Sequence, residues 1–129
     1  MIVGASALIA ILFKEDEALA FAQAMQAAPN RAVAAPTVLE TAMVAEGRSG
    51  PEMGAALDRL LGAMRAEIVP FTAEHAAIAR DAWRRYGKGR HPAALNLGDC
   101  FAYALAQSRN EPLLFKGADF PLTDVKAAL

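Results

Sequence analysis

Short apolar runs alternate along this chain with longer segments of helical periodicity. Four runs have the length and composition of buried strands, and they cover residues 1–3, 32–35, 68–71 and 113–116. Strands that are separated by helices need crossover connections, and such connections produce a parallel sheet. The pattern therefore predicts a three-layer α/β/α sandwich with a central, mostly parallel sheet, formed by residues 1–129 as a single domain.

The segments between the predicted strands carry apolar residues at helical spacing. Helices are expected from about residue 6 and over residues 15–27, 36–46, 53–64, 72–87 and 97–108. In this scheme Leu39 and Met43 face the core from one helix, and Trp83 belongs to the core rather than to a base-stacking surface. The tail after Phe120 is expected to add a short helix or an edge strand.

Composition excludes several classes of protein. The chain has 13 basic and 14 acidic residues, and its net charge of −1 argues against a generic nucleic-acid coat or a basic membrane binder. Its single cysteine, Cys100, rules out an intrachain disulfide and is expected to be a buried, inert thiol in a reducing compartment. The apolar opening at residues 2–13 lacks a preceding basic residue and is too short to span a bilayer. These features predict a cytoplasmic protein with no membrane association.

Three acidic residues fall beside predicted strand ends or helix starts, namely Glu40, Asp99 and Asp119. A fourth such place follows the first strand, where the chain has Gly4. Ligands of open parallel sheets bind beyond the carboxyl ends of the strands, so the three acids are expected to face one crevice. Oxygen ligands without a Cys/His cluster favour Mg²⁺ or Mn²⁺, and such an ion suits the hydrolysis of a phosphodiester backbone.

Each acid also has an ordinary structural explanation. Glu40 follows Thr37 with the spacing of a capping box. Asp99 follows Asn96 by three residues and suits a helix N-terminus, while Asp119 lies in a turn where aspartate is common. Taken singly, these explanations are favoured; only the joint placement of the acids at one sheet edge favours a metal site.

Four stretches carry a resemblance to a known family. They are MIVGASAL at 1–8, TVLE at 37–40, LNLGDCFAYA at 95–104 and LLFKGADF at 113–120. With them the chain resembles, over nearly all of its length, the PIN-domain ribonucleases of the VapC toxin type. The resemblance implies an endoribonuclease that depends on Mg²⁺ or Mn²⁺. By position, Glu40, Asp99 and Asp119 match the acids of that family, and Ser6 matches a small hydroxyl residue near the first acid.

The resemblance also implies partners. These are an RNA substrate, a cognate antitoxin that inserts a segment near the active cleft, and a second toxin molecule in a homodimer. In the family, the apolar helices near the N-terminus pair the monomers and receive the antitoxin. Ordinary packing of these helices against the sheet is the alternative.

Gly4 departs from the family pattern, which has aspartate at this place. Because the loss of an outer-shell partner already lowers metal affinity or activity roughly 10–100-fold, the loss of a direct carboxylate ligand predicts impaired cleavage. A non-catalytic module that binds RNA or the antitoxin is the alternative function. The glycine either drifted in naturally or was introduced or selected because the active protein harms its host; the intact remaining motifs favour the second origin. Ser6 has an alternative role as a helix cap.

Basic residues gather near residue 87. Lys88 and Arg90 lie in a glycine-containing loop, with Arg84 on the preceding helix. Together with Lys116, they are expected to line a phosphate track beside the acids. A solvated helix face and loop is the alternative for any one of them.

Overall fold

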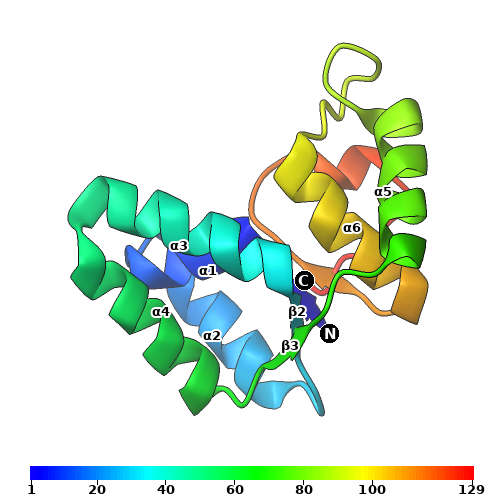
Figure 1. Ribbon diagram of the computed structural model, residues 1–129. Helices are drawn as coiled ribbons and strands as arrows, with labels where there is room; N and C mark the ends of the chain where they lie inside the picture. The colour runs from blue at the N-terminus through cyan, green and yellow to red at the C-terminus, as the bar shows by residue number, and fades with distance from the viewer.

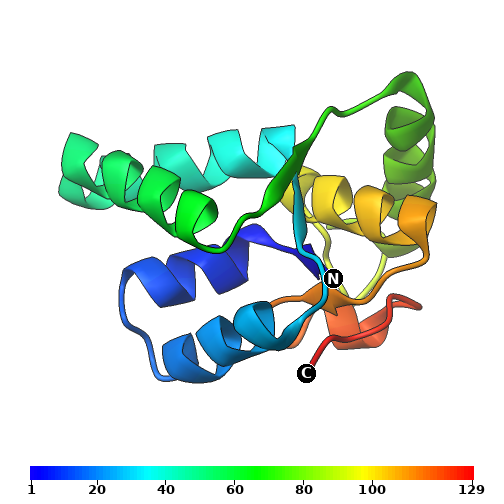
Figure 2. The ribbon, with the colours of Figure 1, turned by 90° about the horizontal axis from the view of Figure 1, so that it is seen from below.

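The computed structural model describes all 129 residues, and its helices pack on both faces of a central sheet (Figures 1 and 2). In chain order the elements are β1 (Ile2–Val3), α1 (Ala5–Leu12), α2 (Ala18–Ala27), β2 (Ala32–Ala34), α3 (Ala35–Ser49), α4 (Pro51–Ala63), β3 (Glu67–Val69), α5 (Ala73–Tyr86), α6 (Leu97–Arg109), β4 (Leu113–Leu114) and the 3₁₀ helix η1 (Phe120–Leu122). The predicted strands and helices are all present, although several ends differ by two or three residues. No helix combines the length and the apolar character that crossing a membrane requires.

The sheet is fully parallel, with the strand order β3-β2-β1-β4. Ile2 of β1 is in register with Ala32 of β2 on one side and with Leu113 of β4 on the other. The chain thus passes from β1 to its neighbour β2 and on to β3 on one side, whereas β4 lies on the other side of β1. This arrangement opens a crevice at the carboxyl ends of β1 and β4, where open α/β sheets bind their ligands.

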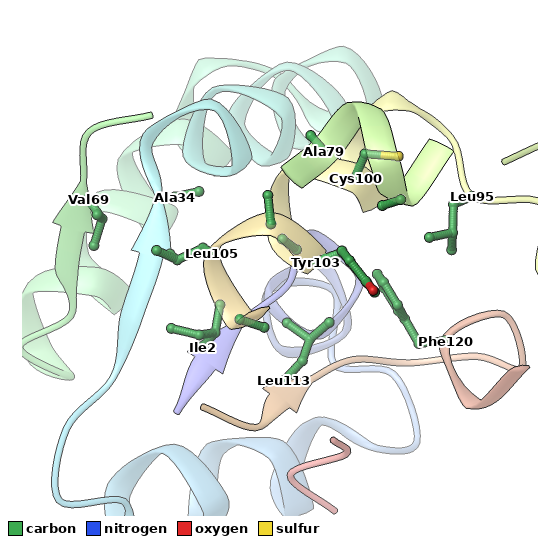
Figure 3. Close-up of a cluster of buried hydrophobic side chains, with 14 of the residues drawn as sticks. Ile2, Ala34, Val69, Ala79, Leu95, Cys100, Tyr103, Leu105, Leu113 and Phe120 are labelled. Atoms are coloured by element: carbon green, nitrogen blue, oxygen red, sulfur yellow. The ribbon is translucent and has the colours of Figure 1, made fainter. Parts of the chain in front are cut away.

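Two separate cores follow from the alternation of side chains along the strands. Ile2 and Leu113 point to the face that α5 and α6 cover, together with Tyr103 of α6 (Figure 3). Val3 and Leu114, one residue further along each strand, point to the opposite face and pack with α1, α2 and α4. The predicted three-layer α/β/α sandwich is therefore confirmed.

The orientation of α3 differs from the prediction. Leu39 and Met43 are 60% and 66% exposed, so the prediction that they face the core is wrong. The helix instead buries Thr37, Thr41 and Ala45, which share one face at four-residue spacing. Small side chains allow α3 to pack closely against α1 and α4, and this leaves its larger apolar residues in solvent.

Trp83 on α5 is likewise outside the core. Its side chain is 44% exposed, whereas Ala79 and Ala82 of the same helix are buried. The guanidinium of Arg90 lies over its ring, 4.1 Å from the ring centroid. The prediction of a core tryptophan is therefore wrong. The apolar face of α5 is wider than the part of it that α6 covers, and Trp83 lies outside the covered part.

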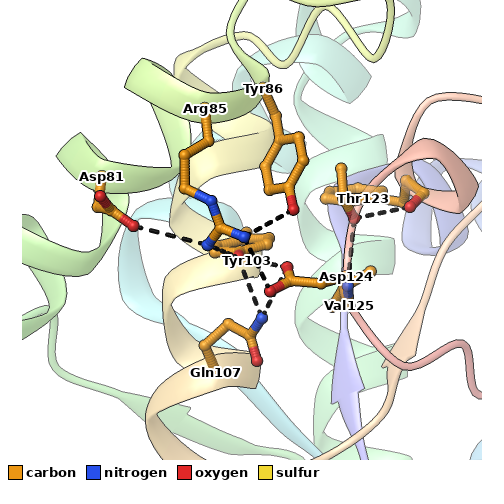
Figure 4. A network of polar contacts seen from close by, with 9 residues as sticks. Asp81, Arg85, Tyr86, Tyr103, Gln107, Thr123, Asp124 and Val125 are labelled. Atoms are coloured by element: carbon orange, nitrogen blue, oxygen red, sulfur yellow. Dashed lines mark hydrogen bonds and ion pairs between the residues drawn. The ribbon is translucent and has the colours of Figure 1, made fainter.

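A polar network fastens the C-terminal tail to α5 and α6 (Figure 4). The Tyr103 hydroxyl donates to Asp124 at 2.6 Å, and the Gln107 amide donates to both groups at 3.0 Å. Arg85 pairs with Asp124 at 3.3 Å and with Asp81 at 3.6 Å. The network holds the tail across the first core, where Tyr103 is nearly fully buried.

Candidate functional site

The first turn of α1 is tied to the end of β4. The Gly4 amide donates to the carbonyl of Leu114 at 2.9 Å, and the Lys116 amide donates to the Ser6 hydroxyl, also at 2.9 Å. Gly4 itself is the N-cap of α1, which has no side-chain cap, so the capping explanation of Ser6 is wrong. Ser6 instead joins the two segments that border the crevice between β1 and β4.

Glu40 extends from the second turn of α3 toward the start of α6. Its half-buried side chain lies against the backbone of Gly98, where a Cβ atom would overlap with the Glu40 carboxylate. Because α3 begins at Ala35, Thr37 lies inside the helix and its buried hydroxyl makes no hydrogen bond. The capping-box explanation of Glu40 is therefore wrong, and its carboxylate is free for another role.

Asp99 occupies the first turn of α6. Its amide donates to the Asn96 side chain at 2.8 Å, and the Asn96 amide donates to Asp99 Oδ2 at 3.0 Å. This capping box confirms the helix-start explanation of Asp99. The bond engages only one carboxylate oxygen, so the other remains able to face the crevice.

The three acids are electrostatically linked. Burial, and after it the charge of Asp99, raises the pKa of Glu40. Burial also raises the pKa of Asp99, with a further contribution from the charge of Asp119, while its bond to the Asn96 amide acts in the opposite direction. Two pairs of carboxylates, Glu40 with Asp99 and Asp99 with Asp119, are thus close enough to repel, and a cation relieves repulsion of this kind.

Asp119 is the most exposed of the three acids. It precedes η1 and follows a turn in which Gly117 adopts a positive φ of 107°, a conformation that favours glycine. Its side chain caps nothing, although its carbonyl accepts from the Leu122 amide at 3.1 Å. The backbone of Asp119 therefore has the turn role that the sequence suggested, while its carboxylate makes no hydrogen bond.

The fit to a metal ion is incomplete. The donors are oxygens of the kind that Mg²⁺ and Mn²⁺ prefer, but no three Asp, Glu, His or Cys side chains lie close enough to hold an ion. Gly4, at the end of β1, adds no ligand. Its backbone, at φ −85° and ψ 162°, accepts any residue, and a Cβ atom would lie 3.2 Å from the Leu114 carbonyl oxygen. A side chain at position 4 therefore requires only a small local shift.

The predicted phosphate track divides into two parts. Arg84, Lys88 and Arg90 are exposed at the end of α5 and in the following loop. Lys116 instead lies 2.6 Å from Glu15 and 3.1 Å from Glu17, so nearby carboxylates compensate its charge. A contact between Lys116 and RNA stays a prediction, and it would require Lys116 to break its ion pairs with Glu15 and Glu17.

Two features of the site were missing from the sequence interpretation. The first is Gly98, which allows the close approach of Glu40. Glycine costs a helix about 1 kcal/mol relative to alanine, so a glycine in the first turn of α6 was itself a signal of close packing. The second is an apolar cleft of about 500 Å³ between α5 and α6 that Trp83 and Phe101 help to line. No pattern in the sequence revealed this cleft, because its walls come from separate segments.

Comparisons with known proteins agree with this architecture. A family model described as the PIN domain matches residues 1–126. The chain is 48% identical over 127 residues to Ribonuclease VapC of Mycolicibacterium smegmatis, covering 98% of each chain, and 46% identical over 125 residues to Ribonuclease VapC30 of Mycobacterium tuberculosis, covering 97% and 95%. The crystal structure of Mycobacterium tuberculosis VapC20, described as a Sarcin-Ricin loop cleaving toxin, has the same fold, with a TM-score of 0.76 at 14% identity over 97% and 98% of the chains. Because the family model and these relatives cover nearly the whole chain, it belongs to the PIN-domain family, among proteins named VapC ribonucleases.

Proposed function

We propose that this chain is the toxin component of a toxin–antitoxin pair, a PIN-domain endoribonuclease whose cleavage of RNA is impaired by Gly4. The observation that carries the proposal is the electrostatic linkage of Glu40, Asp99 and Asp119 at the carboxyl edge of the sheet. Asp99 is coupled by charge to both of the other acids, although the three residues come from distant segments of the chain. The names of the similar VapC ribonucleases support the same reaction.

In this proposal, the three carboxylates are the residues that would hold Mg²⁺ or Mn²⁺. When bound, such an ion offsets their repulsion and lowers the pKa of a coordinated water for attack on the phosphodiester. Gly98 lets Glu40 approach, and Asn96 orients Asp99 through the capping box. The exposed basic residues at the end of α5 and in its loop would position the RNA backbone.

Gly4 limits this activity because it stands where the resembled family carries an aspartate. The chain then has three carboxylates where four would surround the ion, and the three present do not form a group that encloses one. We expect weak metal binding and slow cleavage.

The test is to restore the fourth acid with Gly4→Asp. Gly62→Asp is a matched control, since it adds the same charge at an exposed helix position with nothing within 4 Å. RNA cleavage and thermal unfolding are measured with and without Mn²⁺. We expect Gly4→Asp to gain metal-dependent cleavage, and a metal present at 100 times its Kd to raise its stability by about 2.7 kcal/mol. A restored chain that neither cleaves RNA nor responds to Mn²⁺, although it is folded, would refute the nuclease proposal.

A catalytically inactive binding module for RNA or an antitoxin is the second candidate. The observation that favours it is the lack of any three side chains placed to hold a metal. This candidate predicts that RNA binds to the unaltered chain, and that Gly4→Asp leaves both the binding and the lack of cleavage unchanged.

We also propose a cognate antitoxin and a homodimer as partners in the cytoplasm. Support comes from two large apolar side chains of α3 that the isolated chain leaves in solvent, Leu39 and Met43, which line the same groove. Contiguous apolar surface of this kind usually marks an interaction site. The mass of the chain in solution at low micromolar concentration tests the dimer, and a monomeric mass would contradict it.

A further inference from the structure

The apolar cleft between α5 and α6 has the composition of a binding site. Its volume of about 500 Å³ lies within the range typical of small-molecule sites. Aromatic side chains supply much of the wall; they are Phe71, Trp83 and Phe101. Arg80 and Lys88 are the only charged residues that line it, and no carboxylate does. An apolar interior with a purely basic rim suits a ligand that has a flat apolar body and attached negative charge.

The cleft adjoins the candidate metal site. Asn96 lines the cleft and exchanges two hydrogen bonds with Asp99. Leu97 and Phe101 line both the cleft and a second groove that includes Glu40. A ligand that spans the start of α6 would therefore contact the acids at one end and the aromatic cleft at the other.

The walls of the cleft combine aromatic rings with an adjacent guanidinium. The rings of Phe71 and Phe101 lie edge to face, with their centroids 5.0 Å apart. Trp83 is held by its contact with Arg90, and Gly87 leaves room for it, since a Cβ atom there would overlap with Trp83. Single-stranded RNA is recognised mainly by unstacked bases that lie on aromatic rings and arginine planes, with basic residues along the backbone.

We propose that this cleft takes one unpaired RNA base beside the phosphate that the acids address, with Arg80 and Lys88 contacting the flanking phosphates. This inference rests on the proposed function and adds to it the place where a base of the RNA would bind, which is the cleft between α5 and α6. A second copy of the chain fits the cleft less well, because like-charged rims would face each other.

Trp83 makes the proposal directly testable, because it is the only tryptophan of the chain. Its fluorescence is followed while a metal-free solution of the chain is titrated with a short single-stranded RNA, and separately with a duplex of the same sequence. We expect the single strand to quench Trp83 and the duplex to leave it nearly unchanged. The absence of metal separates this measurement from cleavage.

A pair of neighbouring alanines on α5 supplies matched variants. Both are exposed, but Ala76 lines the cleft and Ala77 does not. Ala76→Leu fills part of the cleft and should weaken single-stranded RNA binding about 5- to 150-fold, the range expected for the loss of one stacked base. Ala77→Leu should bind as the unaltered chain does. Thermal unfolding of both variants verifies that each is folded.

Three outcomes would overturn the inference. The first is equal RNA affinity of the two variants, which places the RNA elsewhere. The second is equal quenching by single strand and duplex. The third is a Trp83 signal that depends on protein concentration without RNA and is lost in Ala76→Leu, which assigns the cleft to a second copy. If Gly4→Asp fails to cleave RNA while Trp83 is still quenched, the nuclease proposal falls and the base site remains.

Discussion

Gly98→Ala tests whether the position of the Glu40 carboxylate depends on the absence of a side chain at Gly98 of α6. Alanine is favoured over glycine in a helix by up to about 1 kcal/mol, which is about 3–5 °C in Tm for a domain of this size. Gly62→Ala should show this gain undiminished, because nothing lies within 4 Å of the added Cβ atom. In Gly98→Ala the new Cβ atom overlaps with the Glu40 carboxylate, so that side chain must rotate away.

The expected size of the effect follows from what has to move. The Glu40 carboxylate is the end of a flexible side chain, and leaving its preferred rotamer costs about 0.5–1.5 kcal/mol. Gly98→Ala should therefore be about 1 kcal/mol less stable than Gly62→Ala while remaining fully folded. In a Glu40→Ala background, the overlap is gone and the two alanine substitutions should have equal effects.

Thermal unfolding followed by circular dichroism provides the assay, together with Mn²⁺ titration of the same substitutions in the Gly4→Asp chain. We expect the displaced carboxylate to weaken the Mn²⁺ response at least 10-fold. If the stability difference persists in the Glu40→Ala background, the cost arises from the backbone of α6 and the proposed contact is not its cause. An unchanged Mn²⁺ response in Gly98→Ala would likewise remove Glu40 from the ligand set.

Three further predictions concern ionisable groups. Because the pKa of Glu40 is raised in the folded state, protonated Glu40 contributes stability below the unfolded-state pKa, and this contribution is lost as the pH rises through the folded-state pKa. Glu40→Gln should therefore raise Tm at pH 7 and lose this advantage below about pH 4. An equal gain at both pH values would show that the pKa of Glu40 is not raised by folding. Burial, and after it the charge of Asp99, raises the pKa of the Cys100 thiol to about 11. A thiol reagent at pH 8 should therefore modify Cys100 only after the chain unfolds. Rapid labelling of the folded chain would instead show that the thiol is accessible. Tyr103→Phe removes the donor to Asp124 and should lower the free energy of unfolding by about 0.5–1.5 kcal/mol in a denaturant titration, whereas no change would mean that the network adds nothing to stability.

Much of the fold could be predicted from the sequence because its strands carry a simple signal. The strands β1, β2 and β4 are apolar and buried on both faces, as a parallel sheet covered by helices requires, whereas the edge strand β3 exposes Glu67 and Ile68; helical periodicity separates each strand from the next. The end of β3 was placed too late, at residue 71 rather than Val69, because Phe71 continues the apolar run after the last paired residue. Apolar composition identifies a strand, but it does not show at which residue the hydrogen-bonded pairing of that strand ends.

The helix faces were harder to predict. Periodicity shows which side chains share a face, but it does not show how much of that face a neighbouring element covers. Leu39 and Met43 continue the apolar pattern of α3 beyond the contact with α1 and α4, and Trp83 does the same on α5. These residues are exposed for the same reason, and the last of them lines the cleft proposed here for an RNA base.

The acids themselves could be located, but their surroundings could not. The charge of Asp99 acts on Glu40 and that of Asp119 acts on Asp99, but no three acids lie close enough to hold an ion, so their joint metal site stays a prediction. Gly98 signals close packing in α6 but does not identify Glu40 as the partner, and the pairing of Lys116 with Glu15 has no local signal. Both contacts join residues that are distant in sequence, and only the packed fold determines such contacts.

The C-terminal tail has a consequence for solubility. Beside β4, the Leu113 amide donates to the Lys126 carbonyl at 2.8 Å, and the Leu113 carbonyl accepts from the Ala128 amide at 2.9 Å. The tail thus occupies backbone groups that would otherwise be available to pair with a strand of another molecule. A chain shortened after Leu122 would expose this side of the sheet and should aggregate as its concentration rises, even where its fold and its acidic crevice are intact.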